Sequence, residues 1–152
     1  SCDDLDALEI SSIIKNHILN GIETAKANRL PDRVIDFIRT HHGTSMIRFF
    51  YEKAIKSNSN ANELDFRYSG PKPFSKETAI VMMADSIEAA SKSLKEPSVE
   101  LIENFVDKII DSQIEDNQFI NSDITLKEIQ TAKKILKEKL NNIYHLRVEY
   151  PD

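Results

Sequence analysis

The sequence has few of the residues on which disulfide-bonded and turn-rich proteins depend. Its 152 residues include one Cys, three Gly and no Trp. A single Cys cannot form an intramolecular disulfide, and it excludes a Cys-rich zinc site. Tight β-turns consume glycine, so the scarcity of this residue disfavours a turn-rich β fold and favours helices.

Two further absences narrow the class of protein. No run of apolar residues approaches the ~18–20 that a membrane span needs, and no signal peptide follows the acidic start. The 25 acidic and 20 basic side chains give a net charge of −5. A general binder of DNA, RNA or anionic membranes is not expected, because it would need a basic face. The composition predicts one soluble domain of a reducing compartment, and the absence of an initiator Met suggests an excised piece.

The spacing of apolar residues predicts an all-α domain. Ile10, Ile14 and Ile18 recur at helical intervals in the first segment, and similar stripes recur along the chain. Six helices are expected, at residues 8–28, 31–42, 44–54, 75–95, 98–110 and 125–143. In the last helix, Leu126, Ile135 and Ile143 are expected to face inward with the other apolar residues. Residues 111–124 are polar and predict a loop, and residues 145–151 predict an extended tail.

The predicted helix ends have residues that suit them. The expected N-terminal caps are Ser75, Ser98, the capping box of Thr125 with Glu128, and either Thr44 or Ser45. Gly43 is expected to end the second helix in a left-handed conformation. Residues 57–74 have no periodicity and are long for a connection, where the median is about 4–6 residues. Such a segment is typical of a lid, which could close over a ligand, or of a binding loop or a disordered stretch.

Four side chains with metal-binding chemistry fall on predicted apolar faces. His17 follows Ile13 by four residues, and the pair His41 and His42 lies at the end of the second helix. Asp85 follows Val81 by four residues, and a carboxylate in such a setting is costly unless it is paired or binds a cation. Imidazole and carboxylate together suit zinc, iron, manganese, cobalt or nickel. Two such ions about 3.5–4 Å apart would be suited to phosphoester hydrolysis.

Each of these residues also has an ordinary structural interpretation. A lone histidine on an apolar face is more often a hydrogen-bonded core residue than a ligand. Adjacent histidines point about 100° apart on one helix, so His41 and His42 can meet at one ion only at a helix end. Asp85 could pair with Arg or Lys in the core. From the residues alone, both interpretations stay open.

Three runs of the sequence resemble a known family. The run Leu30–Ser45, which contains the double histidine, resembles the corresponding segment of the HD-domain phosphohydrolases. More narrowly, it resembles the cytoplasmic domain of the seven-transmembrane HD proteins, the PgpH type. The other agreeing runs are Tyr68–Glu77 together with Met83–Ala90, and Tyr144–Pro151. The resemblance covers essentially the whole chain.

The resemblance implies a fold, an activity and a set of site residues. Such domains are all-helical bundles that bind two divalent transition metals, here expected to be iron or manganese, and cleave cyclic di-AMP to the linear dinucleotide pApA. The positions that match metal ligands of the family are His17, His41, His42 and Asp85. Thr44, Ser45 and Lys72 lie where contacts with the substrate phosphates are expected. The implied partner is a cyclic dinucleotide, and DNA and RNA are not expected.

The sequence departs from the family pattern before His17. The family has an earlier histidine and its eponymous His-Asp dipeptide there, and no histidine precedes His17 in this chain. Residues 1–152 are therefore expected to be the C-terminal portion of an HD domain, cut from a bacterial inner-membrane protein. With three ligands absent, at most partial metal occupancy and no hydrolysis are expected. Apolar surface exposed by the truncation could cause self-association.

Two other functions stay open. One is an HD hydrolase that acts on a nucleotide monophosphate or triphosphate, against which the terminal runs weigh. The other is a non-catalytic nucleotide-binding or signalling helical module, which need not hold iron or manganese.

Overall fold

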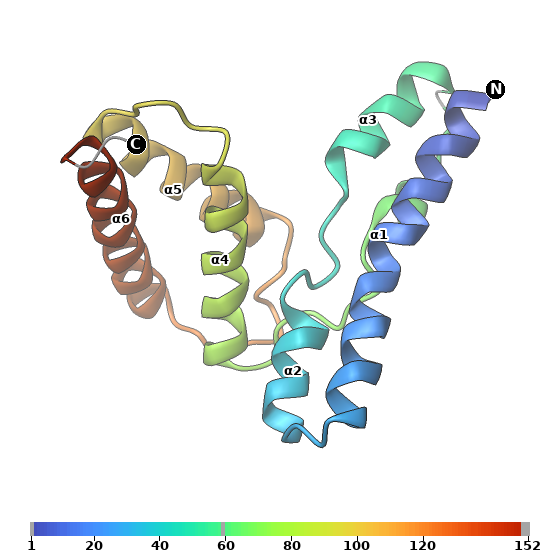
Figure 1. The fold of residues 1–152 in the computed structure, drawn as a ribbon, viewed down its shortest axis with the longest axis horizontal. Coiled ribbons are helices and arrows are strands. Elements are labelled where there is room, and N and C mark those ends of the chain that lie inside the picture. The colour runs from blue at the N-terminus through green and yellow to red at the C-terminus, as the bar shows by residue number, and fades with distance from the viewer. Residues whose placement is uncertain (1, 59, 150–152) are drawn as a thin grey trace. The chain divides into compact units, whose positions relative to one another are not determined.

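The computed structural model describes residues 2–58 and 60–149, and within them the fold is all-helical, as predicted (Figure 1). The α-helices are α1 (Cys2–Ala27), α2 (Asp32–Thr40), α3 (Arg48–Ser57), α4 (Lys76–Ser91), α5 (Val99–Glu115) and α6 (Leu126–Glu149). A 3₁₀ turn, η1 (Glu63–Phe66), interrupts the connection between α3 and α4. No helix in the described ranges carries an apolar stretch long enough to cross a bilayer.

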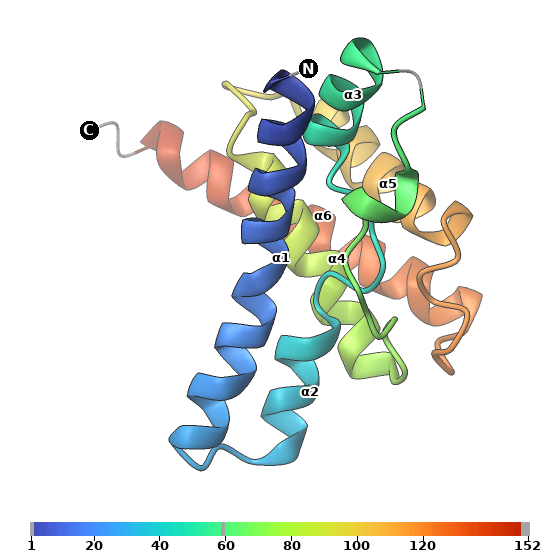
Figure 2. The same ribbon diagram turned by 90° about the vertical axis from the view of Figure 1, so that its right-hand side faces the viewer.

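The chain divides into two compact units, residues 1–72 and 73–152. In the first unit, α2 folds back beside the C-terminal half of α1, and α3 lies beside its N-terminal half (Figures 1 and 2). Ala7, Ala54 and Phe66 are buried between α1, α3 and η1, with Phe50 and Tyr51 packed against them. Small residues on α1 and α3 let these helices approach closely, and this packing fixes the helix that carries His17.

The second unit consists of α4, α5 and α6, with α5 packed against both of its neighbours. Its core holds Met82, Met83, Val106, Ile110 and Leu140, all nearly or fully buried. An apolar stripe on each helix faces this core, as the sequence spacing predicts. The core orients α4, which carries Asp85.

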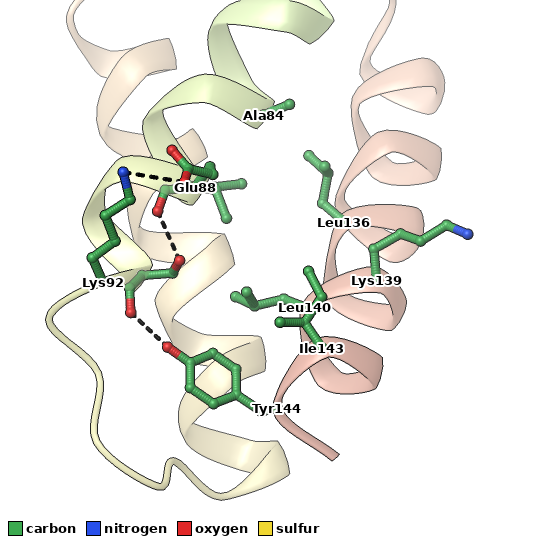
Figure 3. Close-up of a pocket in the computed structure, with 10 residues that line it drawn as sticks. Ala84, Glu88, Lys92, Leu136, Lys139, Leu140, Ile143 and Tyr144 are labelled. Carbon is green, nitrogen blue, oxygen red and sulfur yellow. Dashed lines mark hydrogen bonds and ion pairs between the residues drawn. The ribbon is translucent and has the colours of Figure 1, made fainter. Parts of the chain in front are cut away.

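A pocket of about 220 Å³ opens within the second unit, between α4 and α6 (Figure 3). Leu136, Leu140 and Ile143 point into it from α6. The Tyr144 hydroxyl donates to the Ser91 carbonyl at 2.5 Å and joins the end of α4 to α6. Glu88, Lys92 and Lys139 line the pocket beside these aliphatic side chains, so its described lining holds a single carboxylate and no histidine.

Several predicted helix ends are confirmed. Ser75 begins α4 with a capping box, in which its Oγ accepts from the Thr78 amide at 3.1 Å. Ser98 Oγ accepts from the Leu101 amide at 3.1 Å. Gly43 has the expected left-handed conformation, with φ +51°, but the second helix already ends at Thr40, two residues before its predicted end at residue 42. The capping box of Thr125 with Glu128 is present as well.

The prediction that Thr44 or Ser45 caps the third helix is wrong. This helix begins only at Arg48, and the residue before it, Ile47, supplies no side-chain cap. Ser45 Oγ instead donates to the His42 carbonyl at 2.7 Å, inside the turn that follows α2. The Ile47 amide donates to the Phe66 carbonyl at 2.6 Å, so a long-range backbone bond takes the place of a local cap.

Other predicted boundaries also differ. The first helix begins at Cys2 rather than at residue 8, and the third ends at Ser57 rather than at residue 54. The fourth helix ends at Ser91 rather than at residue 95, and the fifth continues to Glu115, into the predicted loop. Gln113 explains the longer fifth helix. Its Nε2 donates to Ser86 Oγ at 2.8 Å, and this hydrogen bond joins the end of α5 to α4. The last helix runs to Glu149 instead of giving way to an extended tail, and residues 150 and 151 lie outside the described residues.

Some apolar residues predicted to face inward are exposed. Leu126 is 76% exposed at the first position of α6, and Ile135 and Ile143 are each about half exposed. On α1, Ile13 is 63% exposed and His17 beside it is exposed too. The spacing therefore identified helices correctly but overestimated how much of each stripe the described chain covers.

Candidate metal centre

Three histidines of the first unit, one on α1 and two just after the end of α2, gather at one point. Their ligand nitrogens lie within 4.8 Å of one another. The ring centroid of His17 lies 5.6 Å from that of His41 and 5.1 Å from that of His42. The rings of His41 and His42 are 4.0 Å apart. This geometry brings together three of the four predicted metal ligands.

The backbone orients two of the three imidazoles. Nδ1 of His17 bonds to the Ile14 carbonyl, and Nδ1 of His41 bonds to the Ile38 carbonyl at 2.7 Å. A carbonyl can only accept, so each Nδ1 donates its N–H and each Nε2 is the nitrogen left to bind a metal. Metal-binding histidines commonly have this arrangement, since the second nitrogen fixes the tautomer and the ring orientation.

The adjacent histidines converge because α2 ends directly before them. Thr40 is the last helical residue, and His41 follows it as the C-cap. The Gly43 amide donates to the Thr40 carbonyl at 2.9 Å, which closes the turn around His42. His42 is therefore free of the 100° step that separates neighbours on a regular helix.

Burial and two neighbouring imidazoles keep the third imidazole neutral. Removal from water, followed by the nearby imidazoles of His41 and His17, lowers the pKa of His42 to about 4. At neutral pH the ring is uncharged and can offer a lone pair. Three imidazoles whose ligand nitrogens lie this close together are suited to a shared cation.

The fourth predicted ligand lies in the second unit. Asp85 is half-buried on α4 and makes no hydrogen bond or ion pair within residues 2–58 and 60–149. The alternative in which this carboxylate pairs with Arg or Lys thus has no support among the described contacts. Its role as a metal ligand stays a prediction.

The predicted substrate-contact residues follow the double histidine and end the first unit. Thr44 and Ser45 form the turn after His42, and the Thr44 carbonyl accepts from Arg67 Nη1 at 2.9 Å. Lys72 is half-buried at the last position of the first unit. Their contact with a substrate stays a prediction.

Sequence reasoning gave no role to Tyr68, which the structure places at the histidine cluster. Its ring is stacked on that of His42, with centroids 4.3 Å apart and an interplanar angle of 15°. Tyr68 belongs to the segment 57–74, which lacks periodicity. A tyrosine just before the Gly70-Pro71 turn was the available signal, but spacing alone could not pair it with a residue 26 positions earlier.

Comparison with known proteins places this geometry in context. No family model matches the sequence. The chain is 44% identical over 140 residues to the cyclic-di-AMP phosphodiesterase PgpH of Listeria monocytogenes, and 43% identical over 141 residues to PgpH of Bacillus subtilis. These matches cover 92% and 93% of this chain but only 20% of each relative, so the chain spans about a fifth of their length.

Solved structures agree with the sequence comparison. The chain resembles the HD domain of L. monocytogenes PgpH in complex with cyclic-di-AMP, with a TM-score of 0.88 and 41% identity over 91% of this chain and 64% of that one. A second structure of the same HD domain gives a TM-score of 0.84 at 40% identity, over 91% and 65%. The helical fold is that of an HD domain. The chain is homologous to the HD domain of PgpH.

Proposed function

We propose that this chain belongs to a metal-dependent phosphodiesterase that hydrolyses cyclic di-AMP to pApA. The cluster of His17, His41 and His42 is the observation that carries the proposal, because it gathers three imidazoles in a chain 41% identical to a domain solved with cyclic-di-AMP. The donor set fits a divalent transition metal, since imidazole suits zinc, copper, iron and nickel.

Within this proposal, each site residue has a stated task. His17, His41 and His42, with Asp85 as the fourth ligand, hold divalent transition metals, two in the intact domain and iron or manganese by identity. When bound, such ions supply positive charge that stabilises the attacking and leaving oxygens at phosphorus. The chain's own part is to fix the ligand orientation through the Ile14 and Ile38 carbonyls.

Substrate binding is assigned to Thr44, Ser45 and Lys72. The Lys72 ammonium offers a point charge for a phosphate. Ser45 donates both its amide, at 3.0 Å, and its Oγ, at 2.7 Å, to the His42 carbonyl. Its hydroxyl must leave that carbonyl to donate to a phosphate, so substrate binding by Ser45 would loosen the turn that places His42.

We further propose that residues 1–152 are a partial HD domain without turnover of their own. The sequence has no histidine before His17, and so no His-Asp dipeptide to complete a two-metal centre. One partially occupied ion is expected. The exposed Ile10 and Ile13 next to His17 give a surface through which the chain could self-associate.

The parent protein is proposed to be anchored in a bacterial inner membrane, with this domain on the cytoplasmic side.

The decisive experiment measures metal content and hydrolysis together. The purified chain is loaded with Mn²⁺, its bound metal is determined, and its hydrolysis of cyclic di-AMP is followed by chromatography. Wild type is compared with His41→Ala, Asp85→Ala and, as a matched control at an exposed histidine, His145→Ala. We expect bound metal that is lost in the first variant, weakened in the second and unchanged in the control.

Three other results would contradict parts of this proposal. Turnover by residues 1–152 contradicts the proposal that this piece is incomplete. Two results together favour a non-catalytic nucleotide-binding module. The chain would bind cyclic di-AMP with the same affinity in EDTA as with Mn²⁺, and His41→Ala would leave its metal content unchanged. Hydrolysis of nucleotide monophosphates or triphosphates by the parent domain in preference to cyclic di-AMP contradicts the proposed substrate.

A further inference from the structure

Among the described contacts, hydrogen bonds orient only two of the three histidine rings in the cluster, and His42 is the exception. Backbone carbonyls hold Nδ1 of His17 and of His41. Within the described residues, the ring nitrogens of His42 make no hydrogen bond. Metal-binding histidines normally have an outer partner that fixes their orientation. Something other than a hydrogen bond must therefore hold this third ring.

Tyr68 lies where such a support is needed. Its ring lies nearly parallel to that of His42, at 15° and a centroid distance of 4.3 Å. It also meets the His17 ring edge to face, at 6.1 Å and 85°. A metal bond to an imidazole lies in the plane of the ring, so a neighbour stacked on the face blocks rotation and leaves both nitrogens accessible.

The position of Tyr68 is fixed by a short pairing of two segments. Its amide donates to the Ser45 carbonyl at 2.9 Å, and Met46 and Arg67 form an antiparallel β-bridge. Phe66, which directly precedes Arg67, is 1% exposed and anchors this segment in the core of the first unit. The stretch around Tyr68 is thus attached to the turn that follows His42, rather than free to open and close over it.

We propose that Tyr68 is a positioning residue for the metal site, which holds the His42 imidazole in the orientation that binds the ion. The inference rests on the proposed function only in that the three histidines bind a divalent cation. It assigns no contact between Tyr68 and substrate. Removing the Tyr68 ring should weaken metal binding. The His42 ring would then be mobile in the free chain, and binding the ion would cost the entropy of ordering it.

The test uses Co²⁺, whose visible absorption reports ligand geometry, and residues 1–152 throughout. Tyr68→Leu removes the ring but keeps apolar volume, and Tyr68→Phe keeps the ring. Phe49→Leu is the control, since it makes the same kind of change at an aromatic residue that is 71% exposed. Thermal unfolding of each variant in EDTA, followed by circular dichroism, separates an effect on the site from an effect on folding.

We expect Tyr68→Leu to bind Co²⁺ about tenfold more weakly, with an altered absorption spectrum, as is typical when an outer partner of a metal ligand is removed. Tyr68→Phe and Phe49→Leu should bind with wild-type affinity and spectrum. Wild-type affinity and spectrum in Tyr68→Leu would overturn the inference. If wild type binds no Co²⁺, the metal site itself is wrong, and this inference falls with it.

A measurement without metal keeps the inference testable even if Tyr68→Leu does not fold. In the proton NMR spectrum of the wild-type chain in EDTA, stacking on Tyr68 should shift the His42 ring protons upfield of the His145 ring protons. The ring-current shift should persist in Tyr68→Phe. Its absence in wild type would overturn the positioning role, whatever the affinity for Co²⁺.

Discussion

The imidazoles of His41 and His42 lie 4.0 Å apart, although neighbouring side chains on a regular helix diverge by about 100°. They meet because α2 ends at Thr40, so both histidines follow the last regular turn. Two imidazoles so close cannot both be charged without repulsion. The pair therefore links the local end of a helix to the protonation state of the site.

A first prediction concerns the pH dependence of stability. The pKa of His42 falls from 6.5 to about 4, because burial and the neighbouring imidazoles disfavour its charged form. Between these pH values the unfolded chain binds more protons than the folded chain, so stability must decrease as the pH falls. The contribution of His42 is complete above pH 6.5 and is lost as the pH falls towards 4.

This contribution is measured by urea unfolding in EDTA at a series of pH values from 7 to 4. His42→Gln, which cannot titrate, should lose less unfolding free energy over the interval than wild type. Carboxylates titrate equally in both chains, so they cancel from the difference. Parallel curves for the two chains would contradict the lowered pKa.

A second prediction concerns glycine in the loop beside the site. Gly70 has φ +84°, and a Cβ there would lie 3.0 Å from Thr44 Cγ2. Gly70→Ala should lower the unfolding free energy by about 1–2 kcal/mol, because a left-handed conformation is costly for any residue with a Cβ. Equilibrium urea unfolding measures the change.

Gly21 provides the matched comparison. A Cβ there would lie 3.1 Å from Ile38 Cγ2, but the residue is within α1 and has ordinary helical φ. Alanine in a helix interior gains up to about 1 kcal/mol over glycine, which offsets the tight contact. Gly21→Ala should therefore be much less harmful, and an equal loss in both variants would show that space rather than φ decides.

A third prediction is a stabilising substitution on α1. Ser11 is fully buried, and its Oγ has no hydrogen-bond partner within the described residues. A buried hydroxyl without a partner keeps its desolvation penalty, so Ser11→Ala should raise the unfolding free energy by about 1 kcal/mol. Ser12→Ala, at the exposed neighbouring position, should report the small helix-propensity gain alone. A smaller gain at residue 11 than at residue 12 would sink this explanation.

A fourth prediction concerns the start of α4. Ser75 accepts from the Thr78 amide at 3.1 Å, and its own amide donates to Thr78 Oγ1 at 3.0 Å. Ser75→Ala should lower the unfolding free energy by about 1 kcal/mol, since it leaves the Thr78 amide without its acceptor. Ser112→Ala is a suitable control, because this exposed serine bonds only to a carbonyl of its own helix. Equal changes in both melting temperatures would argue against the cap.

The sequence predicted much of the fold because local chemistry decides where helices begin and how they are spaced. Ser75, Ser98 and the Thr125–Glu128 box mark real N-termini, and Gly43 takes the expected left-handed conformation. The errors fall where distant residues intervene. Gln113 extends the fifth helix by bonding to Ser86, and the third helix starts late because Ile47 bonds to Phe66.

For the candidate site, the sequence by itself predicted the ligand set: His17, His41, His42 and Asp85 on predicted apolar faces, the last three within runs that resemble an HD domain. Only the tertiary structure decided that His17, His41 and His42 meet, and that the Tyr68 ring stacks on His42. The physical reason is that spacing fixes which side of one helix a residue occupies, and it cannot fix how two segments pair. That pairing depends on backbone bonds such as Tyr68 to Ser45, which leave no pattern in the order of residues.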